Sequence, residues 1–327
     1  MNRPLVDGFG RVHRDLRISV TDRCNFRCGY CMPAEGLEWL PREDLLTFEE
    51  IERVARLLVE RHGIDSIRLT GGEPTLRANL PELVRLLAAL DVDLALTTNG
   101  ATLRVLAPRL RAAGLRRINV SLDSLYPDRF AELTLRDDLT RVLDGIDAAL
   151  EVGFDPVKVN VVVMRGVNDD ELVDFARFGR EQGVVVRFIE FMPLDADEAW
   201  SDRSVVGQDE IVSAIHAAFP LEPVERSSAP ATRFRYADGG GEIGVVASVT
   251  RKFCDTCDRV RLTADGQFRN CLFAVDEFDL RGVLRSGAGD DELSSVFAGA
   301  VAAKWAGHGI GHVDFIRPAR SMSQIGG

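Results

Sequence analysis

The 327-residue chain has no apolar run close to the ~20 residues that a membrane-crossing helix needs. Its opening residues, MNRPLVDGFGRVHRD, include no apolar core of signal-peptide length. We therefore expect a cytoplasmic protein with no membrane partner. The sequence also has no internal repeat and no low-complexity tract. Its 46% hydrophobic and 28% charged residues are typical of a globular protein and exclude a disordered or fibrous chain.

Positive charge is the scarcer sign, because 40 Lys and Arg face 51 Asp and Glu, which gives a net charge of −11. A negative field argues against sequence-independent binding of nucleic acid, so we expect no nucleic-acid partner. A local basic pocket could still hold a small anion. At about 150 residues per domain, the length predicts roughly two domains.

Cysteine is also scarce, and the six cysteines fall into two tight groups. In a reducing compartment, such clustering favours metal ligands over a disulfide framework. The first group has the spacing C-x3-C-x2-C, which lets three thiolates bind three irons of a 4Fe-4S cubane and leaves the fourth iron open. Alternatives are a zinc site with a fourth ligand from elsewhere, or three small buried side chains. The groups are Cys24, Cys28 and Cys31, and Cys254, Cys257 and Cys271.

Short β-rich runs alternate with helical patterns from Arg14 to Met192. Thr47 and Glu50 form a predicted capping box at one helix start, and Asn168 with Glu171 marks another. Six βα units in succession predict a parallel sheet with right-handed crossovers, curved or closed as a barrel. The predicted strands cover residues 14–20, 65–70, 92–98, 116–122, 157–164 and 184–191.

The most distinctive segments follow the predicted strands. Parallel α/β folds place their active sites where the strands end, so these segments are expected to meet. After Pro193 the alternation stops, and a helix near 208–219 leads into a smaller α+β segment with the second cysteine group. We therefore divide the chain into a core at 1–193 and a C-terminal segment at 194–327. The segments at the strand ends are TDRCNFRCGYC, GGEP, TTNG, Asp123 and Met192-Pro193.

The second cysteine group also has three members, C-x2-C and a third cysteine after thirteen residues. A zinc site completed by His308 or His312 is one alternative, and a fully ligated electron-transfer cluster is another. Gly309 and Gly311 disfavour a metal-binding helix face around the histidines. If three thiolates hold a cluster here too, it also has an open iron that can bind a second molecule.

Arg259 and Arg261 follow the second group at alternating positions. A strand would point both guanidinium groups to one face, beside the cluster. Such a pair could bind the edge of a purine or an anion. The alternative is two solvated arginines.

The first triplet, with Tyr30 directly before its third cysteine, resembles the signature of radical S-adenosylmethionine (SAM) enzymes. GGEP resembles the segment of that superfamily whose backbone contacts the SAM amino group. From about Leu5 to Gly327, the combination of motifs resembles the GTP 3′,8-cyclase family of molybdenum-cofactor biosynthesis. The matching segments are LRISVTDRCNFRCGYCMP, IRLTGGEPTLR, LTTNG, RINVSLDSL, VKVNVVVMRGVND, RFIEFMP, FCDTCDRVRLTADGQFRNCLF and the terminal Gly-Gly.

This resemblance implies a partial (β/α)6 radical SAM barrel followed by a smaller α+β segment. It implies SAM and two 4Fe-4S clusters as cofactors and GTP as substrate. In the family, a 5′-deoxyadenosyl radical removes the C3′ hydrogen of GTP, and the C3′ radical attacks C8 of the guanine, which the open iron of the second cluster holds. The product is 3′,8-cyclo-7,8-dihydro-GTP.

The matched motifs also imply roles for single residues. A triphosphate in an acidic protein needs a local cationic pocket, and Lys158 would be costly to bury unless it faces a ligand. Where the family often has lysine, this chain has Ser66, which weakens one triphosphate contact. The implied cluster ligands are the six cysteines, and the implied SAM contacts are Tyr30, Gly72, Ser121 and Met192. The implied GTP contacts are Arg17, Arg68, Thr97, Lys158, Arg259, Val260 and Arg261, with a catalytic tail of Gly326 and Gly327.

The resemblance implies two protein partners: a reductant such as flavodoxin or ferredoxin, and the next pathway enzyme, cyclic pyranopterin monophosphate synthase. It is compatible with a monomer or a homodimer. Two other hypotheses are a radical SAM enzyme that modifies a peptide with help from an auxiliary cluster, and a zinc-stabilised binding module without catalysis. The terminal Gly-Gly and the two arginines beside the second group favour a nucleotide substrate over a peptide.

Overall fold

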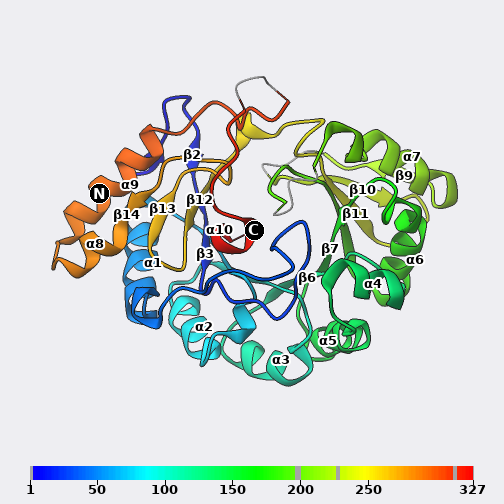
Figure 1. Ribbon diagram of the computed structural model, residues 1–327, viewed down its shortest axis with the longest axis horizontal. Helices are drawn as coiled ribbons and strands as arrows, with labels where there is room; N and C mark the ends of the chain where they lie inside the picture. The colour runs from blue at the N-terminus through cyan, green and yellow to red at the C-terminus, as the bar shows by residue number, and fades with distance from the viewer. Residues whose placement is uncertain (1–2, 196–199, 226–228, 312–314, 327) are drawn as a thin grey trace.

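The structure is a computed structural model that describes residues 3–195, 200–225, 229–311 and 315–326. In these ranges, one sheet of twelve strands curves around the molecule, with helices on its outer side (Figure 1). Its two edge strands do not pair with each other, so the barrel is open. The central strands run parallel and are β3 (Asp15–Ser19), β4 (Ser66–Thr70), β5 (Asp93–Thr98), β6 (Arg117–Ser121), β7 (Val157–Val163) and β8 (Val185–Glu190).

Each of these strands begins and ends within one residue of its predicted bounds, and each is followed by at least one helix. The predicted α/β class with a partial (β/α)6 barrel is therefore confirmed. Among the helices that the structure describes, none combines the length and apolar character that a bilayer crossing requires. The helices of the barrel are α1 (Phe48–His62), α2 (Leu80–Ala88), α3 (Leu103–Ala112), α4 (Pro127–Thr134), α5 (Leu139–Glu151), α6 (Leu172–Gln182) and α7 (Gln208–Ala218).

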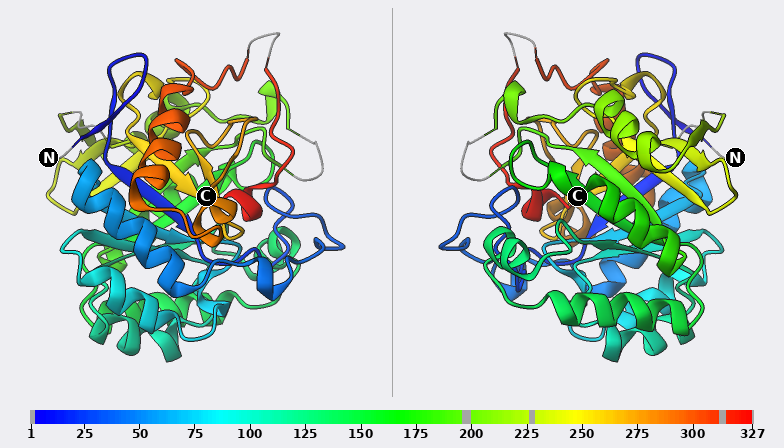
Figure 2. Two further views of the ribbon diagram at one scale, coloured as in Figure 1. Left: turned by 90° about the vertical axis from the view of Figure 1, so that its left-hand side faces the viewer. Right: turned by 90° about the vertical axis from the view of Figure 1, so that its right-hand side faces the viewer.

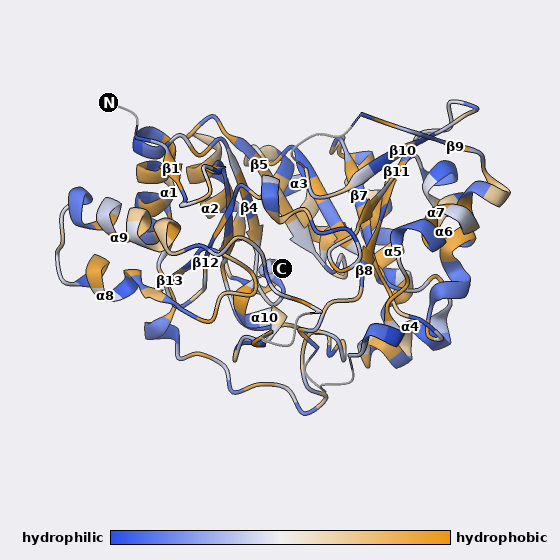
Figure 3. Ribbon diagram, turned by 90° about the horizontal axis from the view of Figure 1, so that it is seen from above, coloured by the Kyte–Doolittle hydropathy of each residue, from blue (hydrophilic) through white to orange (hydrophobic). Residues whose placement is uncertain are grey.

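The alternation of burial along β7 explains how the sheet separates core from cavity. Its four valines at odd positions, 157 to 163, are buried in the core between sheet and helices. The intervening positions, Lys158, Asn160 and Val162, belong to the opposite face of the strand. Figure 3 shows apolar residues concentrated on the strands and polar residues on the outer sides of the helices. A charged residue inside this apolar run therefore lies on the inner side of the barrel.

The predicted capping box of α1 is confirmed. The Thr47 hydroxyl accepts a hydrogen bond from the Glu50 amide at 3.2 Å, and the Glu50 carboxylate accepts one from the Thr47 amide at 2.8 Å. The helix ends at Gly63, whose φ of 75° is the left-handed conformation that glycine adopts without strain. The apolar side of α1 packs into the main core.

The helix start predicted from Asn168 and Glu171 is confirmed as a short 3-10 helix, Asp169–Glu171, with Asn168 at its N-cap position, and α6 follows it from Leu172. Asn168 makes no side-chain cap. Its amide instead donates to the carbonyl groups of Asp123 and Val162 at 2.8 and 2.9 Å. The Asn168 side chain therefore connects the loop after β7 to the loop after β6.

Strands from the C-terminal part extend the barrel sheet at both edges. β11 (Glu242–Val246) pairs in parallel with β8, and β12 (Arg259–Leu262) pairs in parallel with β3. The second cysteine group thus lies next to the first strand of the barrel. The remaining elements are β9 (Leu221–Pro223), β10 (Thr232–Tyr236), β13 (Gln267–Arg269), β14 (Phe278–Asp279), α8 (Leu280–Arg285), α9 (Asp290–Ala302), α10 (Met322–Ile325) and a small hairpin of β1 (Leu5–Val6) and β2 (Val12–His13).

Late segments of the chain return to the N-terminal part. Helix α9 stands against α1, where Arg53 and Asp290 form an ion pair at 2.9 Å (Figure 2). The short helix α10 lies inside the ring of strands (Figure 1). The end of the described chain therefore reaches the interior of the barrel.

Glu190, at the end of β8, joins three segments. Its fully buried carboxylate accepts hydrogen bonds from the backbone amides of Gln208, Val249 and Thr250 at 2.8 to 3.0 Å, and another from the Thr250 hydroxyl. These bonds fix the exit of β8, two residues before Met192, against the start of α7 and the loop after β11. Buried amides at this junction depend on a single acceptor group.

We predict that Glu190→Gln destabilises the fold. The donors around Glu190 share its two carboxylate oxygens, whereas a glutamine side chain has only one acceptor oxygen. The free energy of unfolding should fall by about 1–3 kcal/mol for each amide left without a partner. Denaturant melts of the metal-free chain measure this loss. Glu181→Gln, at an exposed position of α6, is the matched control. An equal effect of the two substitutions would contradict this account of Glu190.

Candidate active site

All six cysteines line one cavity inside the curved sheet. The cavity encloses about 1830 Å³ of space between protein atoms, part of it open to solvent. Cys24, Cys28 and Cys31, the first triplet, lie on the loop after β3. Cys254, Cys257 and Cys271, the second triplet, lie before β12 and after β13. Two groups more than two hundred residues apart in the chain thus share one chamber.

The loop of the first triplet is held against the GGEP segment. The Gly72 amide donates to the Thr21 carbonyl and the Glu73 amide to the Arg23 carbonyl, both at 2.7 Å. A Cβ atom on Gly72 would overlap the carbonyl oxygens of Asp22 and Arg23. Glycine at this position is therefore a requirement for the approach of two backbones.

Glu73 anchors the same region from the other side. Its buried carboxylate accepts hydrogen bonds from the Thr75 amide at 3.0 Å, the Thr98 hydroxyl at 2.7 Å and the Asn99 amide at 2.6 Å. Burial raises its pKa despite these bonds. The loops after β4 and β5 are thus joined beside Cys24.

Burial raises the pKa of the first triplet's thiols, to about 11 for Cys24 and about 12 for Cys31, and the pKa of Cys28 goes well above its ordinary value. The thiolate form that binds iron therefore needs a positive charge brought into the site. Among the described residues, no three or more His, Cys, Asp or Glu side chains are arranged to hold a single metal ion. Three thiols that each bind a different iron need no common point, so the donor set fits a cluster.

The second triplet has a different electrostatic environment. Burial alone would raise the pKa of Cys257, but the positive charges of Arg259 and Lys304 outweigh it and lower the pKa to about 7. Burial raises the pKa of Cys254. One thiol of this triplet is therefore already stabilised as a thiolate by fixed cations.

His308 does not complete a zinc site with the second triplet. Its Nδ1 accepts from the Ile310 amide at 3.2 Å, which leaves the ring proton on Nε2, 3.0 Å from the Ser248 carbonyl. Both ring nitrogens are occupied by backbone groups. His312, the other candidate, lies outside the described residues.

A row of arginines forms part of the cavity wall. The strand register places Arg261 of β12 beside Arg17 of β3, and Arg17 beside Arg68 of β4. Burial, and then neighbouring cations, lower the pKa of Arg17 to about 9, and burial lowers that of Arg68 to about 10. The buried Nε atoms of Arg17, Arg68 and Arg259 have no hydrogen-bond partner in the described part of the chain. These donors are positioned for an anion.

The four residues predicted to contact SAM, Tyr30, Gly72, Ser121 and Met192, all line the cavity. Tyr30 is held in place by its hydroxyl, which donates to the Asp123 carboxylate at 2.6 Å.

The predicted GTP contacts are placed less uniformly. Arg17, Arg68, Thr97, Arg259 and Arg261 line the cavity. Lys158 lies beside this wall, where burial and the charges of neighbouring arginines lower its pKa to about 7. The side chain of Val260 is in the core on the other face of β12, so only its backbone could face a ligand.

The tail reaches the arginine row, because the Gly326 carbonyl accepts a hydrogen bond from Arg261. Gly326 has a φ of 84°, and a Cβ there would overlap the Thr70 hydroxyl and crowd Ser19. Only glycine fits this position. Gly327 lies outside the described residues.

Sequence reasoning missed Arg187, which lines the cavity from β8. Burial, together with the charges of Arg17 and Arg117, lowers its pKa to about 10. The signal was available, since Arg187 interrupts the apolar run VVVRFIEF as Lys158 interrupts VKVNVVVM. Asn160, its register partner on β7, was also missed, and its buried Oδ1 has no partner among the described residues.

Residues 18–179 match the Radical SAM superfamily, and residues 184–310 match Molybdenum Cofactor Synthesis C. GTP 3′,8-cyclase of Rhodopirellula baltica is 51% identical over 99% of this chain and 92% of its own. That of Streptomyces coelicolor is 50% identical over 99% of this chain and 96% of its own. The chain belongs to the GTP 3′,8-cyclase family. The family resemblance predicted from the motifs is thus confirmed.

The similarity to solved structures supports the fold and nothing further. Methylornithine synthase (PylB) superposes with a TM-score of 0.55 at 18% identity, over 88% of this chain and 86% of its own. SuiB of Streptococcus suis, bound to S-adenosylmethionine, gives 0.58 at 14% identity, over 84% and 64%. The GTP 3′,8-cyclase family therefore shares its open barrel with distant proteins.

We predict that Gly72→Ala lowers the iron bound by the reconstituted protein from two clusters per chain toward one, because the new methyl group displaces the backbone just before Cys24. Iron and sulfide analysis measures the change. Gly289→Ala is the control, since nothing lies within 4 Å of a Cβ at that position. Full iron content in the Gly72 variant would show that the close approach is dispensable.

Proposed function

We propose that this protein is a GTP 3′,8-cyclase, a radical SAM lyase that converts GTP to (8S)-3′,8-cyclo-7,8-dihydroguanosine 5′-triphosphate in molybdenum-cofactor biosynthesis. One observation carries the proposal: a single cavity joins both cysteine triplets to a row of buried arginines, and among the described residues the only carboxylate that pairs with this row is Asp15, 4.0 Å from the Nε of Arg17. A radical source, a second cluster and an anion site in one chamber suit an intramolecular cyclisation of a nucleoside triphosphate.

The first triplet would hold the 4Fe-4S cluster that binds SAM, and the second triplet would hold another with an open iron for the guanine. When bound, the first cluster and SAM supply the 5′-deoxyadenosyl radical that removes the C3′ hydrogen. Tyr30, Gly72, Ser121 and Met192 would position SAM. Exclusion of bulk water from the loaded site would protect a reactive radical.

The cationic residues would bind GTP at two points. Arg17, Arg68 and Lys158, joined by Arg187, would hold the triphosphate, because guanidinium groups match phosphate oxygens bidentately. The base would lie by Arg259, the backbone of Val260 and Arg261, next to the second triplet. Thr97 would add a contact from β5.

Ser66 marks a local departure from the family pattern. The register places it between Asp15 and Asp93, so a lysine here would stand between two carboxylates. Arg117 already pairs with Asp93 in this chain. We propose that Arg187 supplies part of the charge that the missing lysine gives elsewhere.

The Gly326-Gly327 tail would enter the reaction chamber. Arg261 holds Gly326, and Arg320 anchors the segment before it through two hydrogen bonds to Asp265, at 2.8 and 3.1 Å. The tail is thus fixed at both ends of α10. We propose that its slim glycines line the reacting part of GTP.

Electrons would come from a reductant such as flavodoxin or ferredoxin, and the product would pass to cyclic pyranopterin monophosphate synthase. The enzyme would act as a monomer or a homodimer. The peptide-modifying alternative is not favoured. SuiB has been solved with the precursor peptide SuiA, but this chain resembles it at 14% identity, against about 50% for the relatives named GTP 3′,8-cyclase.

The test is an anaerobic assay of the reconstituted protein with SAM, dithionite and GTP, with ATP as control. Mass spectrometry follows 5′-deoxyadenosine and the cyclised nucleotide. Both products should form with GTP and only background with ATP. Formation of 5′-deoxyadenosine without cyclised GTP would retain the radical chemistry and refute the substrate.

We predict that Cys→Ala at any position of the first triplet abolishes 5′-deoxyadenosine, because the SAM-binding cluster is lost. The same change in the second triplet should spare uncoupled SAM cleavage but lose the cyclised product. Both products are quantified by the same mass-spectrometric assay. If the two sets of variants behave alike, the proposed division of labour is wrong.

We predict that GTP binding takes up a proton through Lys158. Its pKa of about 7 in the free protein leaves it mostly neutral at about pH 8, and the charge of a triphosphate raises that pKa, so about one proton should be bound per GTP. Titration calorimetry in buffers of different ionisation enthalpy measures this uptake. Lys158→Met should abolish it, and uptake unchanged in that variant would assign the proton to another group.

A further inference from the structure

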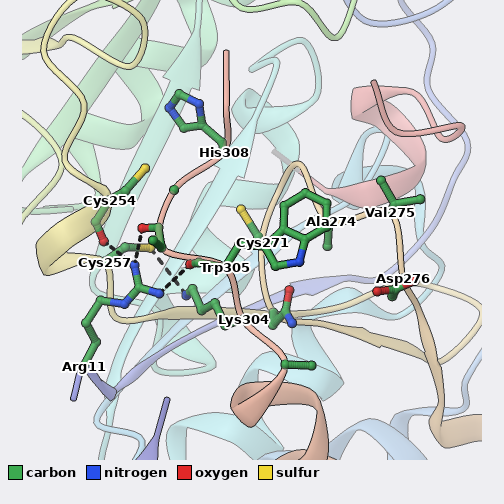
Figure 4. Close-up of a pocket in the computed structure, with 14 residues that line it drawn as sticks. Arg11, Cys254, Cys257, Cys271, Ala274, Val275, Asp276, Lys304, Trp305 and His308 are labelled. Atoms are coloured by element: carbon green, nitrogen blue, oxygen red, sulfur yellow. Dashed lines mark hydrogen bonds between the residues drawn. The ribbon is translucent and has the colours of Figure 1, made fainter. Parts of the chain in front are cut away.

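A second pocket lies behind the second triplet. Cys254, Cys257 and Cys271 line both the large cavity and this smaller pocket of about 430 Å³, so they form a partition between the two. The lining of the small pocket includes the exposed residues Trp305 and Val275 (Figure 4). The second cluster would therefore be approached by protein groups from a side that GTP does not occupy.

Lys304 is a buried cation of this pocket whose ammonium contacts a cysteine sulfur. It follows α9, and its Nζ donates to His13 Nε2 at 2.8 Å, to the Arg259 carbonyl at 2.8 Å and to Cys257 Sγ at 3.6 Å. These three acceptors use all three of its protons. Figure 4 shows the ammonium directed at the triplet.

No carboxylate of the described residues forms an ion pair with Lys304. Asp7 pairs with Arg11 at 2.6 Å, and Asp258, whose charge interacts with that of Lys304, forms no ion pair with it in the described part of the chain. His13 accepts a hydrogen bond from the Lys304 ammonium through Nε2, so the imidazole is neutral and offers no negative charge. A buried ammonium normally has an anionic partner, and the group in contact with Lys304 that can become negative is the Cys257 sulfur.

Arg11 has a different role in the same pocket. Its guanidinium donates to the backbone carbonyls of Cys254, Trp305 and Ala306 at 2.6 to 2.8 Å, and its charge is balanced by Asp7. It holds the backbone around the triplet. Of the charged side chains described in the lining of this pocket, Lys304 is the one that donates to a cysteine sulfur, while the Cys254 thiol accepts from the His308 backbone and the Cys257 thiol also accepts from Arg259.

The identity of the residue is informative. The chain has only three lysines among its 40 Lys and Arg: Lys158, Lys252 and Lys304. Arginine serves nearly every other cationic position. A compact ammonium with three divergent protons fits three acceptors in a small space, whereas a planar guanidinium fork does not.

We propose that Lys304 is a positioning residue for the second cluster, whose ammonium hydrogen-bonds the Cys257 sulfur and raises the reduction potential of that cluster. The inference rests on the proposed function, because it requires a cluster on the second triplet. Hydrogen bonds to cluster sulfurs and nearby positive charge stabilise the more negative, reduced state. In the first triplet, the Cys24 sulfur accepts from the neutral donors Phe26 N and Asn99 Nδ2, and the nearby cation, Arg27, donates to the Cys24 carbonyl instead of the sulfur.

The experiment uses the full-length chain with the first triplet replaced by alanine, so that only the second cluster is present. Iron analysis and visible absorbance establish the cluster, and a redox titration followed by electron paramagnetic resonance gives its midpoint potential. Absence of iron in this parent would refute the second cluster itself and therefore the proposed function.

In this background, Lys304→Met should shift the midpoint potential to more negative values, and Lys304→Arg, which keeps the charge, should remain closer to the parent. Lys252→Met is the matched control, because its Nζ donates to the Ile310 carbonyl instead of a sulfur. An unshifted potential in a fully loaded Lys304→Met protein would overturn the proposal.

Loss of iron from Lys304→Met is also decisive. If Lys304→Arg then keeps the cluster near the parent potential, the charge is what the site requires and the proposal stands. If both variants lose the cluster, Lys304 serves the fold and the proposal fails. In the chain lacking the second triplet instead, Lys304→Met should leave the potential of the first cluster unchanged.

Discussion

An excess of buried positive charge is the constraint on which this structure depends. Strand register sets Arg261, Arg17 and Arg68 side by side, and among the described residues only Asp15, 4.0 Å from the Nε of Arg17, forms an ion pair with any of them. A folded chain tolerates such a row only where a ligand completes it. Arg261 also positions the tail, because it donates a hydrogen bond to the Gly326 carbonyl. The arginine row and the tail at Gly326 thus depend on one set of hydrogen bonds between strands.

The second constraint is topological. β12 pairs in parallel with β3 on one side of the barrel sheet, whereas β9, β10 and β11, which precede it in the sequence, lie on the other side. This pairing brings the second triplet, from late in the chain, to the cavity. The two triplets line one cavity of the same sheet, so no domain movement is needed to bring them together. Their surroundings differ in charge, because Glu73 and Asp123 lie by the first triplet while Arg259 and Lys304 lie by the second. Two similar ligand sets can therefore serve different chemistry.

Local pattern predicted the central strands to within a residue, and it predicted the capping box of α1. The position of Lys158 was predicted because a charged residue within an apolar strand must face a cavity. The same pattern around Arg187 was overlooked. Pairing of β11 and β12 with the barrel edges depends on contacts between distant residues, which no local pattern contains. The side-chain contact of Asn168 could not be predicted for a related reason, since its amide donates to a neighbouring loop instead of capping its own helix.

The most direct test of the central claim is whether a triphosphate completes the arginine row. Melting of the metal-free protein should be followed with GTP, with inorganic tripolyphosphate and with guanosine. The account predicts that GTP and tripolyphosphate both raise the melting temperature, guanosine does not, and Arg68→Met removes the gain. Stabilisation by guanosine alone, with no effect of tripolyphosphate, would contradict it.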